Sequence, residues 1–409
     1  MHSMLLAKPV EYHASKGRLS GRCRFRQRGL SRGRWQPMQE VSRSTCSSCG
    51  FLLRKRYGRR STVSRIIDKE LETLFTAAER RGRCVRPATK RLAGALSRRL
   101  PAGGFRRVFH GMYARTQWWN SLSRQFQALA IMRTLQDAHP EWVFCHESAG
   151  IAHGLPVDVL SLGNIHLMVS GQTHDSSRAS GVRRHRVDDV SSVRREGLNV
   201  TTLEQTAFDC MRTAEFPRAL AIADALVKLS GRSSTDLCYR FLKNHRGAKG
   251  VRHAARTLLY ANAQSDNGGE SYARGVMIKH GFALPRLQVP FPHPADTRVT
   301  YRIDYVWTRE DGSLVFGELD GMGKYQGSCH VADGPSVRVF ADERKRESML
   351  SLYGAPIVRF AFSDVLNEQR FCRLLKQFGV PQSDGIAALE GWLSRTQSVS
   401  AVTFEVFEQ

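Results

Sequence analysis

The first regular pattern along the chain is a set of apolar residues at helical spacing. In SRIIDKELETLFTAAERRG they stand three to four residues apart, as on one helix face, at Ile66, Ile67, Leu71, Leu74 and Phe75. A second, basic helix is predicted over 89–100, and GGFRRVFHGMYAR predicts two short strands around a turn. Helix, basic helix and basic hairpin together predict a degenerate winged-helix-like domain over 61–117.

The middle of the chain mixes short strands with helices. NIHLMVS, GVRRHRVD and GLNV predict strands, and a helix is expected to start near Thr202. Gln205 stands three residues after Thr202, which predicts a capping box. Another helix should start near Glu215, before a Ser/Gly break. We expect an α/β domain over 118–230 and a helical connector over 231–265.

The C-terminal region predicts the element order α-β-β-β-α-β-α. Its first helix carries Glu270, and the polar segment AQSDNGGES just before it predicts a hinge and the main domain boundary. We place this domain at 266–380 and a peripheral tail at 381–409. The whole pattern predicts a multidomain protein of the α+β or α/β class.

Composition narrows the class of protein. The chain has 409 residues, 41% hydrophobic and 24% charged, which is typical of a globular protein with two or three domains. The sequence contains no apolar run of membrane-spanning length and no secretory signal pattern. Nine scattered cysteines predict reduced thiols and a cytoplasmic location. We interpret the single CxxC, Cys46–Cys49, as two incidental thiols and not as a zinc site.

Positive charge points to nucleic acid as a partner. The net charge is +25, and residues 1–60, which we predict to be a disordered basic arm, contribute +13 of it. Basic segments bind polyanions by releasing counterions. A solvated tail and a wrongly assigned start codon are the alternatives for this arm. In the winged-helix-like region the candidate DNA contacts, or else a solvated face, are Lys90, Arg91, Arg106 and Arg107.

Acidic residues gather in the strands YRIDYVW and VFGELDGMGKY. A turn centred on Asp311 would make Asp304 and Glu318 opposite neighbours in a hairpin, with Gly312 in the left-handed conformation. Asp320 would project from the same face as Glu318. Carboxylates this close repel each other, and a shared Mg²⁺ ion would neutralise them.

This cluster of carboxylates predicts a site that hydrolyses phosphodiesters. A purely structural role for the same carboxylates is the alternative. Asp304, Glu318 and Asp320 are the candidate metal ligands, and Glu270 could reach them from the preceding helix. Lys324 is the candidate for orienting water or neutralising the scissile phosphate. The alternative is that these carboxylates form ion pairs with Arg302, with Lys324 or with the basic helix containing 343–346.

The residues 266–378 resemble the PD-(D/E)xK nuclease-like domains related to very-short-patch-repair endonucleases. The resemblance is carried by YRIDYVW, VFGELDGMGKY and DERKRESMLSLYGAPIVRFAFSDV. It implies a restriction-endonuclease-like fold in which Glu270, Asp304 and Glu318 serve a Mg²⁺ site and Lys345 lies on a DNA-binding helix. The lysine that usually follows the glutamate by two residues is Asp320 here, so Lys324 would have to replace it.

Residues 120–228 resemble the AbiEi antitoxins of type IV toxin–antitoxin systems. The matching pieces are CHESAGIAHGLP, NIHLMVS, GVRRHRV and GLNVTTLEQTAFD…ALAIADALV. The resemblance implies an operator-binding winged helix and a cognate toxin of the nucleotidyltransferase type. Ser148 is expected to cap a helix and His146 to be a buried hydrogen-bonding residue, with a nucleophilic role for this set as the alternative, and His153 is expected to be structural.

Two functions follow from these observations. The first is a Mg²⁺-dependent DNA endonuclease or nicking enzyme guided by antitoxin-like modules. The second is a DNA-binding repressor or antitoxin whose nuclease-like domain has lost catalysis. The acidic set favours the first function, and the missing lysine favours the second.

Overall fold

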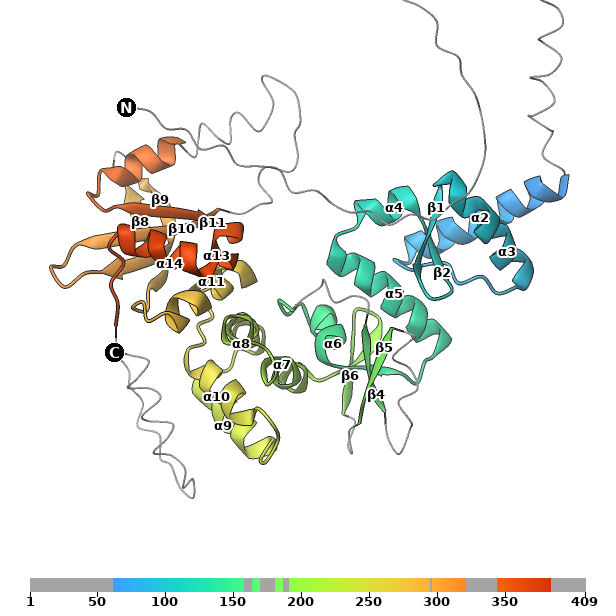
Figure 1. The fold of residues 1–409 in the computed structure, drawn as a ribbon, viewed down its shortest axis with the longest axis horizontal. Coiled ribbons are helices and arrows are strands. Elements are labelled where there is room, and N and C mark those ends of the chain that lie inside the picture. Colours follow the sequence, from blue (N-terminus) through green and yellow to red (C-terminus); the bar gives the residue numbers. More distant parts are fainter. Residues whose placement is uncertain are drawn as a thin grey trace, which may run out of the picture. The chain divides into compact units, whose positions relative to one another are not determined.

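The computed structural model describes residues 62–157, 164–169, 181–186, 191–294, 296–320 and 344–383. All of the described residues belong to one of the two units into which the chain divides, the unit 61–409. The predictions for the basic arm, for Lys324 and for most of the tail therefore lie outside the described residues. The described part combines many helices with a two-, a four- and a five-stranded sheet, which confirms an α+β multi-sheet protein (Figure 1). It contains no helix long and apolar enough to span a membrane.

The first described region is a helix pair with a hairpin. Its elements are α2 (Thr62–Arg80), α3 (Lys90–Arg99), the 3₁₀ turn η1 (Leu100–Ala102), β1 (Phe105–Phe109) and β2 (Met112–Arg115). Leu71 and Phe75 on α2 pack against Leu96 on α3 in a core of their own. Ile66 is 58% exposed, so the buried stripe of α2 is narrower than the sequence pattern indicated.

The next region is built around the five-stranded sheet. It contains α4 (Thr116–Ser121), α5 (Arg124–Ala138), β3 (Val143–Phe144), α6 (His146–His153), β4 (Ile165–Val169), β5 (Val182–Arg186), β6 (Ser192–Arg195), β7 (Leu198–Thr201) and α7 (Leu203–Met211). The strand order is β5-β4-β3-β7-β6. The sequence pattern did not predict β6, whose four residues are all exposed and carry no apolar alternation toward a core.

The start of α7 confirms half of the predicted capping box. The Thr202 side chain accepts a hydrogen bond from the Gln205 backbone N at 3.4 Å. The Gln205 side chain does not return to the cap, because its Nε2 donates to Oδ2 of Asp209 at 3.0 Å. The reciprocal half of the box is therefore wrong.

Three helices follow, namely α8 (Phe216–Ser230), α9 (Ser234–Asn244) and α10 (Val251–Leu259). They share one apolar core with α7, contributed by residues such as Phe208, Ile222, Leu226, Phe241 and Leu258. The predicted connector 231–265 is thus helical, as expected, and is packed against the helices that precede it.

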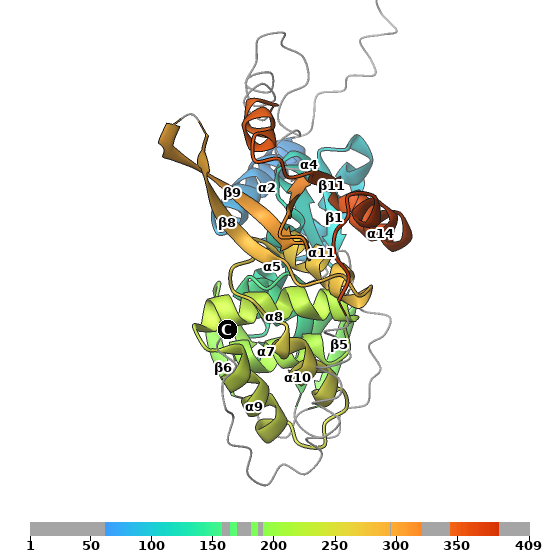
Figure 2. The same ribbon diagram turned by 90° about the vertical axis from the view of Figure 1, so that its left-hand side faces the viewer.

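The C-terminal region has the predicted element order with one addition, a short helix between the last strand and the last helix. It consists of α11 (Gly268–Lys279), β8 (Arg286–His293), β9 (Asp296–Thr308), β10 (Leu314–Asp320), a helix over 344–351, β11 (Ile357–Ala361), α13 (Phe362–Leu366) and α14 (Glu368–Gln377). The sheet order is β11-β10-β9-β8, and only the β10–β11 pair is parallel. Figure 2 shows the long β8–β9 hairpin with α11 and α14 beside the sheet.

Both faces of this sheet are covered, which fixes where its polar residues can lie. Tyr305 and Trp307 pack with residues of α11 and α14 on one face. Val306 and Phe316 pack with Leu350 of the helix over 344–351 on the other. Because successive strand residues alternate between faces, a carboxylate inside this sandwich must find a polar partner there.

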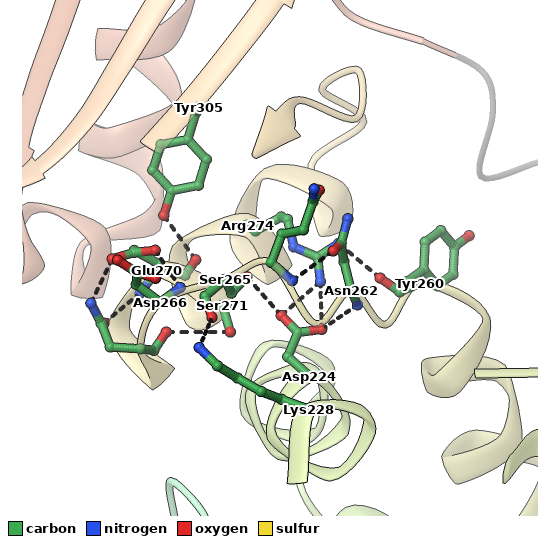
Figure 3. Close-up of polar contacts among 12 residues, drawn as sticks. Asp224, Lys228, Tyr260, Asn262, Ser265, Asp266, Glu270, Ser271, Arg274 and Tyr305 are labelled. Atoms are coloured by element: carbon green, nitrogen blue, oxygen red, sulfur yellow. Dashed lines mark hydrogen bonds and ion pairs between the residues drawn. The ribbon is translucent and has the colours of Figure 1, made fainter. Parts of the chain in front are cut away.

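The segment that we predicted to be a hinge is held by a buried ion pair. Asp224 on α8 and Arg274 on α11 are 3% and 4% exposed and lie 2.6 Å apart. Asp224 also accepts hydrogen bonds from Asn262 N at 2.8 Å and Ser265 Oγ at 3.0 Å (Figure 3). The Gly275 position approaches Pro217 so closely that a Cβ atom there would lie 2.5 Å from its Cα. The segment is therefore a packed connection and not a free linker.

Candidate functional site

The β9–β10 hairpin has the register that the sequence predicted. Leu314 pairs with Thr308 and Gly317 with Tyr305, so the turn is centred on Asp311. Gly312 has a φ of 79°, in the left-handed region that glycine adopts without strain. The same register, continued by one residue, aligns Glu318 with Asp304.

Asp304 is joined to both neighbouring strands by its carboxylate. Its Oδ2 accepts a hydrogen bond from Leu319 N of β10 at 3.0 Å. Its Oδ1 accepts one from Nε2 of Gln288 on β8 at 3.1 Å. Gln288 stands between the pairs Leu287–Tyr305 and Val289–Ile303, which brings it level with Asp304. Gln288 has a φ of 53°, an unfavourable value for this residue inside a strand.

Glu270 enters the same cluster from the first turn of α11. Glu270 is only 7% exposed. Its Oε2 accepts hydrogen bonds from Gln288 Nε2 and from Asp266 N, both at 2.9 Å. Burial, and secondarily the nearby Asp304 charge, raises the pKa of Glu270 to about 7. Glu270 therefore changes protonation near neutral pH, which an ordinary glutamate does not.

An unpaired oxygen completes this cluster. Gln288 Nε2 donates to both carboxylates, while the buried Gln288 Oε1 has no hydrogen-bond partner. Rotating the amide would place its oxygen against two carboxylates, so the arrangement is the favourable one. We call Glu270, Gln288 and Asp304 the acidic cluster. It offers the oxygens of two carboxylates in a partly desolvated place, and these are the ligand type that Mg²⁺ requires.

Glu318 and Asp320 have different partners from Asp304. Arg346, on the helix over 344–351, donates to both oxygens of the buried Glu318, at 2.5 and 3.0 Å. Arg359 on β11 donates to Asp320 at 2.5 Å and approaches Glu318 at 4.0 Å. The contact of one guanidinium with both carboxylates agrees with the predicted shared face. For Glu318 the alternative of ion pairing with the 343–346 helix is realised, whereas Arg302 pairs with Asp266.

The predicted DNA contacts are all at the surface. Lys90, Arg91, Arg106, Arg107 and Lys345 are exposed. Arg91 forms a salt bridge with Glu70 at 2.6 Å, and Arg106 donates to Asn120 Oδ1 at 3.1 Å. These are surface contacts of the kind that exchange readily with water or phosphate.

A second polar cluster lies beside the five-stranded sheet, and it corrects two predictions. Cys145, not Ser148, is the N-cap residue of α6, and Ser148 Oγ accepts a hydrogen bond from His166 N at 2.9 Å. His146 is buried as expected, but its Nδ1 has no hydrogen-bond partner. His153 is structural, since its Nε2 contacts the Thr201 carbonyl at 2.7 Å.

Sequence reasoning missed Gln288, Arg359 and the partners of His146. A polar residue within the otherwise apolar strand LPRLQVPF was the signal for Gln288. Histidines at 166 and 185 were visible in their strands, but nothing in strand periodicity indicates that two strands and a helix start bring their rings together.

Comparisons with known proteins identify relatives of this chain. Two proteins of Mycobacterium tuberculosis, uncharacterized protein MT2308 (strain CDC 1551 / Oshkosh) and uncharacterized protein Rv2248 (strain ATCC 25618 / H37Rv), are each 30% identical to it over 206 residues. The match covers 50% of this chain and 70% of each relative. No family model and no solved structure matches the chain. This extent of similarity shows that the chain belongs to the same protein family as the mycobacterial proteins MT2308 and Rv2248.

Proposed function

We propose that this chain is a DNA-binding protein whose C-terminal region cleaves phosphodiesters with Mg²⁺, in toxin–antitoxin or defence biology. The observation that carries the proposal is the acidic cluster. Glu270 and Asp304 are held together by one glutamine, and the hydrogen bonds to their carboxylates come from backbone and side-chain amide groups. A buried carboxylate beside a half-buried one is costly unless a cation or a proton compensates the two charges.

Each residue of the acidic cluster has a role in this proposal. Asp304 would hold the metal, with Glu318 as a further ligand when Arg346 moves away, and Gln288 would position the two carboxylates through its Nε2. A bound Mg²⁺ supplies charge stabilisation to a phosphodiester and an acidified water. Glu270, with a pKa of about 7, suits the acceptance of a proton from that water at neutral pH. Asp320 would complete the shell, and Lys324 from the following segment would neutralise the phosphate.

DNA binding in this proposal depends on the basic surface. Lys90 and Arg91 lie on α3, and Arg106 and Arg107 lie on β1, the hairpin expected to act as a wing. Lys345, on the helix over 344–351, is exposed near the guanidinium that pairs with Glu318. These side chains would neutralise phosphates of the bound DNA.

Nicking of supercoiled plasmid tests the catalytic part. We expect Mg²⁺-dependent nicking by the full chain, and a loss of about 100-fold or more in Asp304→Asn and Glu270→Gln. Glu310→Gln is the matched control, because Glu310 is an exposed carboxylate at the turn of the same hairpin. Equal nicking by Asp304→Asn and the control would refute the catalytic assignment.

A repressor or antitoxin function is the second candidate, and one observation favours it. Arg346 and Arg359 neutralise Glu318 and Asp320 without any metal. A domain fixed in this way can serve as a docking platform for DNA or for a nucleotidyltransferase-type toxin. Gel shifts on the protein's own promoter test it: binding should persist in Asp304→Asn and weaken steeply with salt. No shift at low salt would end this candidate.

A further inference from the structure

Three potential metal ligands meet in the region of the five-stranded sheet, far along the chain from the acidic cluster. One ligand atom from each of Cys145, His146 and His185 lies within 4.8 Å of the other two. Among the residues that the structure describes, these three form the group of potential ligands that meets this criterion. Two of them stand at the junction of β3 and α6, and the third is on β5.

His146 has a strained backbone conformation, and one nitrogen of its buried ring lacks a hydrogen-bond partner. Its φ is 49°, a left-handed value that a non-glycine residue adopts only when its surroundings impose it. The side chain is buried, with 9% of its surface exposed, and Nδ1 has no hydrogen-bond partner. Its ring stacks on that of His185 with centroids 3.7 Å apart, so the two rings would have to turn apart for their in-plane lone pairs to meet at one ion. A buried nitrogen without a partner is a cost that an ion would remove.

The neighbouring residues orient the set as outer partners of a metal site do. His185 Nε2 and His166 Nδ1 share a hydrogen bond of 2.9 Å, and Glu147 Oε2 lies 3.3 Å from the same His166 nitrogen. Glu147 Oε2 is itself buried without a hydrogen bond. Chains of histidine and carboxylate behind a ligand fix its tautomer and raise its basicity. The hydrogen bond leaves Nδ1 of His185 available.

Charged groups lie around these three residues. Glu147 and Asp209 are negatively charged neighbours of Cys145, and Arg212 is a positively charged neighbour of His146. The two carboxylates would partly offset the charge of a bound cation, and the guanidinium of Arg212 would oppose it.

We propose that Cys145, His146 and His185 bind a zinc-class divalent ion, which ties β5 to the start of α6. One thiolate and two imidazoles are ligands that zinc prefers, and they differ in kind from the oxygen donors of the acidic cluster. Binding converts the Cys145 thiol to a metal thiolate and releases one proton to solvent, with no change in oxidation state. A water molecule would occupy the fourth position. His185 is only partly buried, which gives the ion a path from solvent.

Cobalt and zinc titration of the full chain tests this site. The reference chain carries Cys46→Ser and Cys49→Ser, so that the CxxC pair cannot contribute. We expect it to bind one equivalent of Co²⁺ with a thiolate-to-cobalt charge-transfer absorption that Zn²⁺ abolishes by displacement. Cys145→Ser should remove this absorption while Cys238→Ser, which alters an equally buried thiol in another core, should keep it.

His185→Ala provides the second reading of the same experiment. It should weaken Zn²⁺ binding by at least about 100-fold, since losing even an outer partner of a zinc ligand costs about 10–100-fold. His185 is partly exposed, so its replacement by alanine should leave the fold intact. If Cys145→Ser does not fold, the Zn²⁺ affinity of His185→Ala tests the site by itself. The proposal is overturned if the reference chain binds neither ion, if the absorption persists in Cys145→Ser, or if His185→Ala binds Zn²⁺ as tightly as the reference.

Discussion

Two buried carboxylates beside α11 have opposite kinds of surroundings. Asp224 contacts the guanidinium of Arg274 at 2.6 and 2.8 Å and accepts two further hydrogen bonds. Glu270, one helical turn before Arg274, accepts hydrogen bonds from amides and lies near the negative Asp304. Both appear in Figure 3, each with its own set of contacts.

The difference separates a group that holds the fold from a group suited to chemistry. A carboxylate with its own buried cation and full hydrogen bonding is compensated within the protein. A buried carboxylate that is compensated only by amide donors is stabilised further when it binds a proton or a metal ion. Asp224 should therefore control the stability of the fold. Glu270 should control how stability and activity depend on pH and on metal ions.

Breaking the Asp224–Arg274 pair should have the largest effect. Asp224→Ala leaves a 4%-exposed guanidinium without its partner, and we expect a loss of about 3–5 kcal/mol in the free energy of unfolding. Urea denaturation of the full chain measures it. The double variant Asp224→Leu with Arg274→Met should lose less, because neither charge is then left unpaired. A loss below about 1 kcal/mol in Asp224→Ala would contradict the structural role of this pair.

Glu270 should make stability depend on pH in the opposite sense to an ion-paired carboxylate. Its pKa is raised from 4.5 to about 7, so the folded state binds more protons than the unfolded state between these values. Stability from this group is therefore present below about pH 4.5 and is lost as the pH rises through about 7. Denaturation midpoints in a chelator at pH 5 and pH 8 should show this loss in the wild type and a smaller one in Glu270→Gln. The same loss in both chains would contradict the raised pKa.

Arg346 tests whether Glu318 belongs with the acidic cluster. Arg346→Met leaves Glu318 buried without its bidentate partner, and we expect destabilisation by about 1–3 kcal/mol in a chelator. If Glu318 can act as a ligand, added Mg²⁺ should recover more stability in this variant than in the wild type. Thermal unfolding with and without Mg²⁺ measures both effects. Equal Mg²⁺ effects in the two chains would assign Glu318 to a purely structural ion pair.

Replacing the surface arginines of the β1–β2 hairpin should have the smallest effect on stability. Arg106→Gln with Arg107→Gln should leave stability unchanged within about 0.5 kcal/mol, because both side chains are exposed. If both contact phosphates, the slope of log binding constant against log salt should fall by about 2. Gel shifts over a salt series measure the slope, with Arg86→Gln as an exposed basic control in the same region. An unchanged slope would remove this hairpin from the DNA interface.

The sequence predicted the C-terminal region well because local rules govern it. Gly312 and the apolar alternation around it determine the hairpin register, and therefore that Asp304 and Glu318 are neighbours. The partners of these carboxylates could not be predicted in the same way. Gln288 reaches the acidic cluster through a rare backbone conformation, and Arg359 reaches Asp320 from a strand that returns 39 residues later.

The middle of the chain shows the same limit. Thr202 was predictable as a cap from its spacing, but its partner Gln205 was drawn instead to Asp209 by tertiary structure. The approach of His146 to His185 depends on how three segments pack, for which no periodicity exists in the sequence.

The effect of Mg²⁺ on the unfolding temperature at pH 8 tests the central claim most directly. At this pH Glu270 carries its charge, so a cation bound by Asp304 and attracted by the adjacent Glu270 should raise the unfolding temperature of the wild type as its concentration increases. Glu270→Gln and Asp304→Asn should lose most of this rise, and Glu310→Gln should retain it. No rise in the wild type, or an equal rise in all four chains, would contradict the account.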